Sequence, residues 1–210
     1  MISTGMAIRF YSWPMSSGAR THWALEELGL PYEYVQLDRT KQEHRQPAFL
    51  AINPNGKVPA LVDDDVAYFE SLAIALYLGE RYGVERKLWP SATKDRADAL
   101  SWSAWALVEL QYNLREYIYH GLASRISYKP EQQSKAAAEF NLDRTQKNFA
   151  MLDRRLADRE HVCGAFTLVD TLVGATVRFG TMMGVKIDGV PNVDAYVERL
   201  NKRPALARVK

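Results

Sequence analysis

The chain has 210 residues, of which 47% are hydrophobic and 25% charged, a composition typical of folded proteins that excludes disorder as the main state. Its 27 Lys and Arg residues and 25 Asp and Glu residues leave a formal net charge of +2 and are interspersed along the chain. Nucleic acid is therefore not an expected partner.

The first eighty or so residues mix short strands with helices. Residues 7–11 predict a strand that breaks at residues 12–14, and residues 20–28 carry apolar side chains at helical spacing before Gly29. Alternation over residues 32–37 predicts a second strand. The chain is therefore expected to begin with a βαβ unit.

A second group of elements follows in the same part of the chain. Residues 47–52 predict a brief helical turn, which the turn formers at 53–56 end. Two short strands are expected at 58–62 and 66–69, joined by three aspartates as in an antiparallel hairpin. A helix then runs over residues 70–82, so the order is βαβ followed by ββα.

Everything after about Pro90 is predicted to be helical. A helix of about 25 residues is about 38 Å long, more than the small N-terminal unit could cover, so these helices must form a bundle of their own. The expected helices cover 94–119, 131–156, 168–182 and 193–200. The expected domains are 1–82 and 91–210, with a linker at 83–90.

Chemistry that needs several cysteines or clustered histidines is not expected. Cys163 is the only cysteine, which excludes an intrachain disulfide, a CxxC pair and a cysteine-rich zinc site, and fits a reducing compartment. The four histidines have no metal-ligand spacing, so no metal site is predicted. The apolar segments near the N-terminus are too short for a signal sequence or a membrane span. We therefore expect a cytoplasmic protein with no membrane partner.

Three short motifs carry a family resemblance. Residues 16–20 (SSGAR) follow the first strand, residues 53–61 (NPNGKVPAL) lead into the hairpin, and Glu70-Ser71 opens a helix. Their order and spacing resemble the cytosolic glutathione transferases, and residues 166–170 (FTLVD) extend the resemblance to the C-terminal half. An arginine four residues after Ser16 resembles the serine-type, theta- or phi-like bacterial classes. The implied fold is an α/β thioredoxin-like domain followed by an all-helical domain.

The resemblance implies a detoxifying enzyme that conjugates the glutathione thiolate to small apolar electrophiles. Glutathione would be a co-substrate, no other cofactor is implied, and the family assembles as homodimers. A glutathione-dependent isomerase or peroxidase is one alternative, although isomerase relatives show Ser-Ser-Cys where this chain has Ser-Ser-Gly. A transferase-fold interaction protein without turnover is another. The absence of a cysteine near Ser16 disfavours a reductase of glutathione mixed disulfides.

Ser16 is the catalytic residue that the resemblance implies, because its spacing to Arg20 matches the family's catalytic serine. A hydroxyl where a strand turns into a helix lies near the positive end of the helix dipole, an environment that stabilises a thiolate. Such donors lower the thiol pKa from about 8.5 and increase the thiolate population at neutral pH. An ordinary N-cap is the alternative for Ser16. Ser17 is a second candidate donor, Tyr11 stays a candidate because other classes use a tyrosine near this strand's end, and Arg20 is expected to brace the helix.

Val58, Pro59, Glu70 and Ser71 are implied to bind glutathione. In the family the Val-Pro peptide bond is cis, and the backbone of the residue before proline pairs with the cysteinyl unit like an added strand. The Ser71 hydroxyl and the helix amides would hold the γ-glutamyl carboxylate, and Glu70 its ammonium group. Without the resemblance, a trans bond and a simple Glu-Ser helix start would be expected.

The glycyl carboxylate of glutathione needs a cation, for which Arg45 and Lys57 are the candidates. Arg45 stands where family members often carry a basic residue, and Lys57 precedes the Val-Pro step, although a plain surface charge explains Lys57 equally well. Aromatic residues at helical spacing are mostly core. Some are nevertheless expected to line the electrophile pocket, and the candidates are Trp13, Tyr112 and Tyr119.

A Thr-x-x-Asp pattern predicts the start of a late helix. Thr167 and Asp170 have the spacing of a capping box, in which each side chain satisfies an amide at the helix start. We therefore assign both residues to folding and not to the active site.

Overall fold

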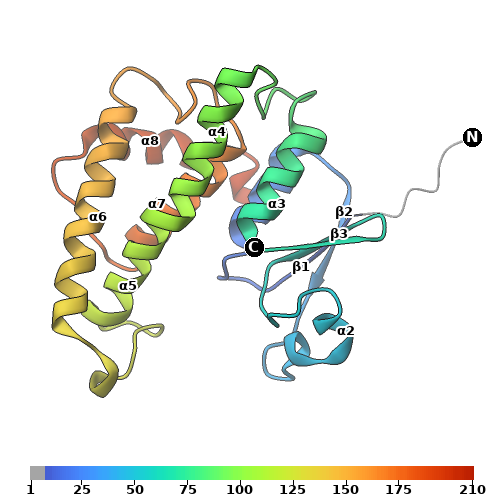
Figure 1. Ribbon diagram of the computed structural model, residues 1–210, viewed down its shortest axis with the longest axis horizontal. Coiled ribbons are helices and arrows are strands. Elements are labelled where there is room, and N and C mark those ends of the chain that lie inside the picture. Colours follow the sequence, from blue (N-terminus) through green and yellow to red (C-terminus); the bar gives the residue numbers. More distant parts are fainter. Residues whose placement is uncertain (1–7) are drawn as a thin grey trace, which may run out of the picture. The chain divides into compact units, whose positions relative to one another are not determined.

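The computed structural model describes residues 8–210, which form two compact units (Figure 1). One unit extends to Trp89 and also includes Arg203–Lys210, and the other is Pro90–Lys202. The first seven residues of the expected N-terminal domain, including residue 7 of the predicted first strand, lie outside the described residues.

This division differs from the expected boundaries at two places. Trp89 belongs to the first unit because its ring packs on Gly79, its Cβ lies close to Gly83, and its Nε1 donates a 3.0 Å hydrogen bond to Glu80. Residues 203–210, which the sequence places in the helical domain, are part of the first unit as well.

The first unit is built on a four-stranded mixed sheet in the order β2-β1-β3-β4. Strand β1 is parallel to β2 and antiparallel to β3, and β3 and β4 form the predicted antiparallel hairpin. The thioredoxin-like order of elements is therefore confirmed. The elements are β1 (Ile8–Ser12), α1 (Ala19–Leu28), β2 (Tyr32–Gln36), α2 (Pro47–Leu50), β3 (Ala60–Asp63), β4 (Val66–Phe69) and α3 (Ser71–Leu78).

Helices cover both faces of this sheet because successive side chains of a strand point to opposite sides. Phe10 of β1 faces α1, with its ring 5.6 Å from that of His22. The next residue, Tyr11, faces α2 and lies 5.9 Å from Phe49. Tyr11 is only 8% exposed and belongs to the apolar core, the position expected of a strand-terminal core residue.

The strand directions bring three loops to one edge of the sheet. Ser12, at the end of β1, pairs with Gln36 at the end of the parallel β2. Ala60, at the start of the antiparallel β3, pairs with Tyr11. The segments after β1, after β2 and before β3 therefore meet at this edge. The Val58–Pro59 bond in the third segment is cis, as the resemblance implies.

The C-terminal segment is attached to α1 by a chain of polar contacts. Arg203 donates two 2.6 Å hydrogen bonds to the Glu27 carboxylate, and Arg208 forms an ion pair with Glu26. The backbone N–H of Lys210 donates to Nδ1 of the buried His22 at 3.1 Å. Residues 203–210 are therefore a structural part of the first unit.

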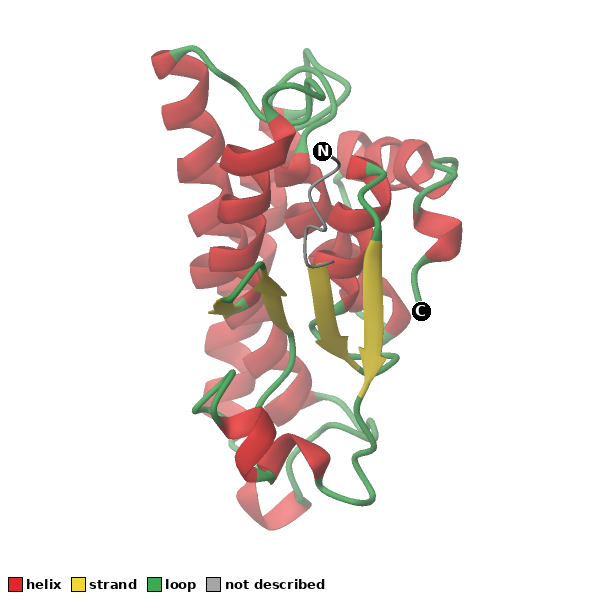
Figure 2. Cartoon of the chain, turned by 90° about the vertical axis from the view of Figure 1, so that its right-hand side faces the viewer, coloured by secondary structure: helices red, strands yellow, loops and turns green. Residues whose placement is uncertain are grey.

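The second unit consists of helices, coloured red in Figure 2. The predicted helix 94–119 is continuous but contains a π-helical stretch, and the predicted helix 131–156 begins later because the Ser134 hydroxyl caps it. No helix among residues 8–210 is long and apolar enough to cross a membrane. The helices are α4 (Thr93–Trp105), the π-helical Ala106–Gln111, α5 (Tyr112–Gly121), α6 (Lys135–Arg155), α7 (Leu168–Met182) and α8 (Pro191–Asn201).

Helix α7 begins with the predicted capping box of Thr167 and Asp170. The Asp170 carboxylate is fully buried and accepts hydrogen bonds from the Thr167 N–H at 2.8 Å and the Val162 N–H at 3.0 Å. It also accepts one from the Tyr196 hydroxyl at 2.9 Å. Burial raises the pKa of Asp170, and these hydrogen bonds oppose that rise. Asp170 thus joins the start of α7 to the preceding loop and to α8.

Candidate active site

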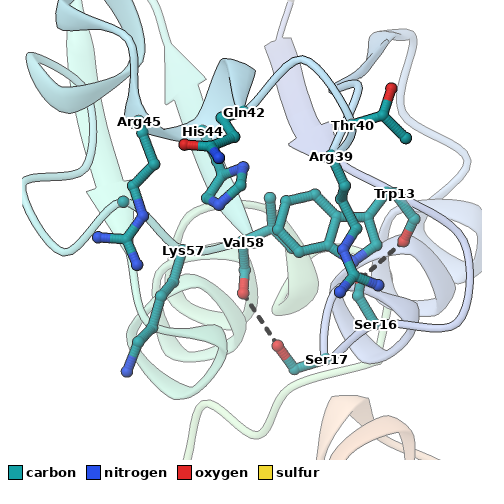
Figure 3. Close-up of a pocket in the computed structure, with 11 residues that line it drawn as sticks. Trp13, Ser16, Ser17, Arg39, Thr40, Gln42, His44, Arg45, Lys57 and Val58 are labelled. Atoms are coloured by element: carbon teal, nitrogen blue, oxygen red, sulfur yellow. Dashed lines mark hydrogen bonds between the residues drawn. The ribbon is translucent and has the colours of Figure 1, made fainter.

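A pocket of ≈ 1030 Å³ lies where the three loops of the first unit meet. Figure 3 shows that the loops after β1 and β2 and the segment before β3 all contribute to it. Ligand pockets in proteins are commonly about 300 to 1,000 Å³, so this one has the size of a ligand-binding site. The lining residues are Trp13, Ser16, Ser17, Arg39, Thr40, Gln42, His44, Arg45, Gly56, Lys57 and Val58.

Most of the sequence-predicted site residues come together in this pocket. Its lining includes Ser16, Ser17, Arg45, Lys57, Val58 and Trp13. It does not include Pro59, which is buried, or Glu70 and Ser71 at the start of α3. Tyr112 and Tyr119 belong to the second unit.

Ser16 lies in a small hydrogen-bonded network just before α1. Its hydroxyl donates to the Trp13 carbonyl at 2.7 Å, and its Oγ lies 3.1 Å from the Ser12 Oγ. The Gly18 N–H donates to the Ser16 Oγ at 3.1 Å. A hydroxyl whose oxygen accepts a hydrogen bond is itself a stronger donor. The Ser16 hydroxyl is therefore a polarised donor at the wall of the pocket.

Gly18 fits this network because it has no side chain. A Cβ added at Gly18 would lie 2.0 Å from the Ser12 Oγ and 3.1 Å from the Ser16 Oγ. Its backbone φ of −65° is open to any residue, so the requirement is steric. The glycine of the Ser-Ser-Gly sequence is thus explained by the Ser12 and Ser16 hydroxyls behind it.

Ser17 connects the start of α1 to the segment before β3. Its hydroxyl donates a 3.0 Å hydrogen bond to the Val58 carbonyl, drawn as a dashed line in Figure 3. A carbonyl oxygen has two lone pairs, so this bond leaves the Val58 carbonyl able to accept a second donor. Ser17 is therefore placed to orient the Val58 backbone.

Arg20 links α1 to α3. The Arg20 side chain is 5% exposed, and its Nη1 donates to the Ser71 Oγ at 3.3 Å. Burial lowers the pKa of Arg20 to about 10, which still leaves it charged at neutral pH. This contact agrees with the bracing role expected for Arg20. The neighbouring Glu70 is exposed and has a φ of 67°, a strained backbone conformation for a residue with a side chain.

The loop after β2 supplies pocket residues that the sequence analysis did not select. These are Arg39, Thr40 and Gln42. The Arg39 guanidinium lies 5.4 Å from the centroid of the Trp13 ring, and the His44 ring meets that indole edge-on at 5.3 Å. The predicted βαβ unit could have indicated this loop. The loops that follow two parallel strands lie at the same end of the sheet, so the loop after β2 is expected beside the loop after β1.

Among the described residues, three cationic side chains line the pocket and no acidic side chain does. Within residues 8–210, the Arg39, Arg45 and Lys57 side chains form no ion pair and no hydrogen bond with another group. Unpaired cations around a pocket of this size attract anionic ligands.

Comparisons with known proteins agree with this geometry. Residues 6–80 match the glutathione S-transferase N-terminal domain, and residues 118–204 match the glutathione S-transferase C-terminal domain. The chain is 34% identical to Glutathione S-transferase GstB of Escherichia coli (strain K12) over 188 residues, which are 88% of each protein. It is 32% identical to Glutathione S-transferase F13 of Arabidopsis thaliana, over 97% of this chain and 95% of that one.

A solved relative carries glutathione. The theta class glutathione S-transferase from Xanthomonas axonopodis pv. citri, with glutathione bound, superposes with a TM-score of 0.83 at 27% identity. The match covers 97% of this chain and 96% of that one. The chain therefore belongs to the glutathione S-transferase family of enzymes.

Proposed function

We propose that the protein activates the thiol of glutathione and transfers the resulting thiolate to small apolar electrophiles, in a cytoplasmic detoxifying role. The observation that carries the proposal is the pocket itself, where two hydroxyls at the start of α1 and the Val58 backbone face a set of unpaired cations. Glutathione fits these features because it is an anionic tripeptide with one thiol.

In this proposal each part of glutathione has its own partner. The cysteinyl unit pairs with the Val58 backbone as an added strand, which the free lone pair of that carbonyl allows. The glycyl carboxylate binds Arg45 and Lys57, which lie on the same side of Val58 (Figure 3). The γ-glutamyl group binds at the start of α3, where Ser71 donates to its carboxylate and Glu70 pairs with its ammonium group.

The chemical step follows from the position of Ser16. Its hydroxyl and the N-terminal end of α1 favour the thiolate over the thiol, so the pKa of bound glutathione falls and more nucleophile is present at neutral pH. The sulfur then attacks an electrophilic carbon and forms a C–S bond. In a substitution the leaving group departs with the electrons of the broken bond, and in an addition the adjacent atom takes a proton.

Conjugation of 1-chloro-2,4-dinitrobenzene to glutathione tests this function, and Ser71→Ala tests the γ-glutamyl site. We expect turnover in the parent and an apparent KM for glutathione about tenfold higher in Ser71→Ala, with kcat little changed. The reason is that a hydrogen bond to a charged group contributes about 1.5 to 3 kcal/mol. Steady-state rates at varied glutathione concentration give both constants.

Two controls accompany this measurement. Ser91→Ala removes an exposed serine outside the pocket and should leave KM unchanged. Because Ser71 also accepts a hydrogen bond from Arg20, the thermal midpoint of Ser71→Ala must be compared with the parent's. Equal KM values in the parent and Ser71→Ala would show that this helix start is only structural. A parent that neither turns over nor binds immobilised glutathione would favour a non-catalytic interaction protein.

We also propose that the protein is a homodimer. Support comes from strand β4, where Val66 is 52% exposed and Phe69 37% exposed, because apolar side chains on a sheet edge favour association. Light scattering at micromolar concentration should give a mass near twice the 23.9 kDa of one chain. A mass near that of one chain would contradict the proposal.

A further inference from the structure

One of the cations that line the pocket has no proposed partner on glutathione. Bound glutathione in its thiolate form has two uncompensated negative charges, on the thiolate and the glycyl carboxylate, since its γ-glutamyl group is a zwitterion. The pocket lining has three cations, Arg39, Arg45 and Lys57, and no carboxylate. Under the proposed function, which this inference presupposes, the glycyl carboxylate is the partner of Arg45 and Lys57, and Arg39 has no partner on glutathione.

Arg39 lies apart from the other two cations. In Figure 3, Arg45 and Lys57 are on one side of Val58, whereas Trp13 and Arg39 are on the other, the side of Ser16. The Arg39 guanidinium lies over the Trp13 ring at 5.4 Å. Stacking on an aromatic ring holds an arginine in place while its N–H groups stay free to bind an anion.

The loop that carries Arg39 is held by its own hydrogen bonds. The Asp38 carboxylate accepts from the Thr40 N–H at 2.8 Å and the Thr40 hydroxyl at 2.6 Å, and forms an ion pair with Lys41 at 3.8 Å. The Glu43 carboxylate accepts from the Asp38 N–H at 2.7 Å. The acidic groups nearest in sequence to Arg39 are therefore engaged with other partners, and Arg39 projects from an ordered loop.

We infer that Arg39 and Trp13 form a subsite for the carboxylate of the acceptor substrate, so that the preferred electrophiles are flat apolar rings bearing a carboxylate. The ring would lie against the Trp13 indole, and the carboxylate would accept paired hydrogen bonds from the Arg39 guanidinium. The carboxylate takes no part in the reaction. The glutathione sulfur attacks the ring carbon that bears a halide, the C–S bond forms, and the halide leaves with the electron pair of the carbon–halogen bond.

A matched pair of acceptors tests the subsite, namely 4-chloro-3,5-dinitrobenzoate and its neutral amide, 4-chloro-3,5-dinitrobenzamide. We expect Arg39→Gln to lower kcat/KM about tenfold for the acid and less than about twofold for the amide, because only the acid loses a charge-assisted hydrogen bond. Arg39→Lys should retain part of the preference for the acid. Equal losses for acid and amide in Arg39→Gln would overturn the inference.

The matched control is Lys41→Gln. It removes one positive charge from the same loop, at a residue that is 74% exposed and does not line the pocket. If Lys41→Gln lowers acid turnover as much as Arg39→Gln does, the effect comes from the net charge of the loop and the subsite is contradicted.

A binding measurement separates this inference from the proposed function. Calorimetric titration of 3,5-dinitrobenzoate, which has no leaving group, into protein saturated with S-methylglutathione needs no turnover. Binding in the parent that weakens about tenfold in Arg39→Gln supports the subsite even if conjugation is absent, in which case only the proposed function fails. If Arg39→Gln binds 3,5-dinitrobenzoate as tightly as the parent, or if the parent does not bind it, the subsite is contradicted even if conjugation is observed.

Discussion

Replacing Ser16 with alanine should lower kcat for glutathione conjugation by about 10- to 100-fold while the KM for glutathione changes little. A hydrogen bond from a hydroxyl to a charged group contributes about 1.5 to 3 kcal/mol, and in the proposed mechanism Ser16 favours the thiolate over the thiol. Its oxygen accepts the Gly18 N–H, which strengthens its hydroxyl as a donor. Binding through Val58, Glu70 and Ser71 should persist.

The direct measurement is a pH titration of thiolate absorbance with glutathione bound. The pKa of the bound thiol should be about one to two pH units higher in Ser16→Ala than in the parent. The fraction of thiolate at a fixed neutral pH should fall accordingly. Ser17→Ala should change the titration much less, because the Ser17 hydroxyl is engaged with the Val58 carbonyl.

Two further variants decide between the candidate hydroxyls. Tyr11→Phe should leave the titration unchanged, since Tyr11 is 8% exposed and packs in the apolar core against Phe49. A titration that moves only in Tyr11→Phe would make the enzyme tyrosine-type, and one that moves only in Ser17→Ala would transfer the role to Ser17. If no variant moves it, the amides at the start of α1 activate the thiol and Ser16 is a helix cap.

Asp170→Ala should lower the free energy of unfolding by about 3 to 4 kcal/mol. The substitution leaves the buried N–H groups of Val162 and Thr167 without an acceptor, and each unsatisfied donor costs about 1 to 3 kcal/mol. The Tyr196 hydroxyl loses its acceptor as well. For a chain of about this size, the loss corresponds to a thermal midpoint lower by about 10 °C, measured by circular dichroism.

Two control variants show whether the loss of stability comes from the hydrogen bonds of Asp170 or only from the removal of a negative charge. Tyr196→Phe removes one hydrogen bond and should cost about 1 kcal/mol. Asp158→Ala removes an exposed carboxylate, 74% exposed, and should stay within about 0.5 kcal/mol of the parent. An Asp170→Ala protein as stable as the Asp158→Ala protein would show that the buried carboxylate does not hold α7 in place.

The pocket residues that could be predicted from the sequence are those that lie in short local motifs. Ser16, Ser17 and Val58 lie in short segments whose turn and helix signals have a direct physical cause, and the structure brings them into one pocket. Arg39 could not be selected from the sequence, because its position over the Trp13 ring arises only once the parallel strands have paired. No local pattern distinguishes such an arginine from a surface charge.

The same reason explains the difference in domain boundaries. Residues 203–210 form no long periodic element, so the sequence offered no sign that they leave the helical domain. Their contacts to Glu26 and Glu27 span 182 and 176 positions. Strand and helix patterns report short-range order, whereas this attachment is made by individual arginines at long range.

That attachment also sets the order in which the protein can be completed during synthesis. Residues 203–210 leave the ribosome only after all of Pro90–Lys202 has been made. At about 5 to 20 residues per second, the first unit waits on the order of ten seconds after its Trp89 is added before its last contacts are available. During that interval Glu26 and Glu27 lack their arginine partners. The first unit is therefore the first to be synthesised in part but the last of the two to have all its residues available.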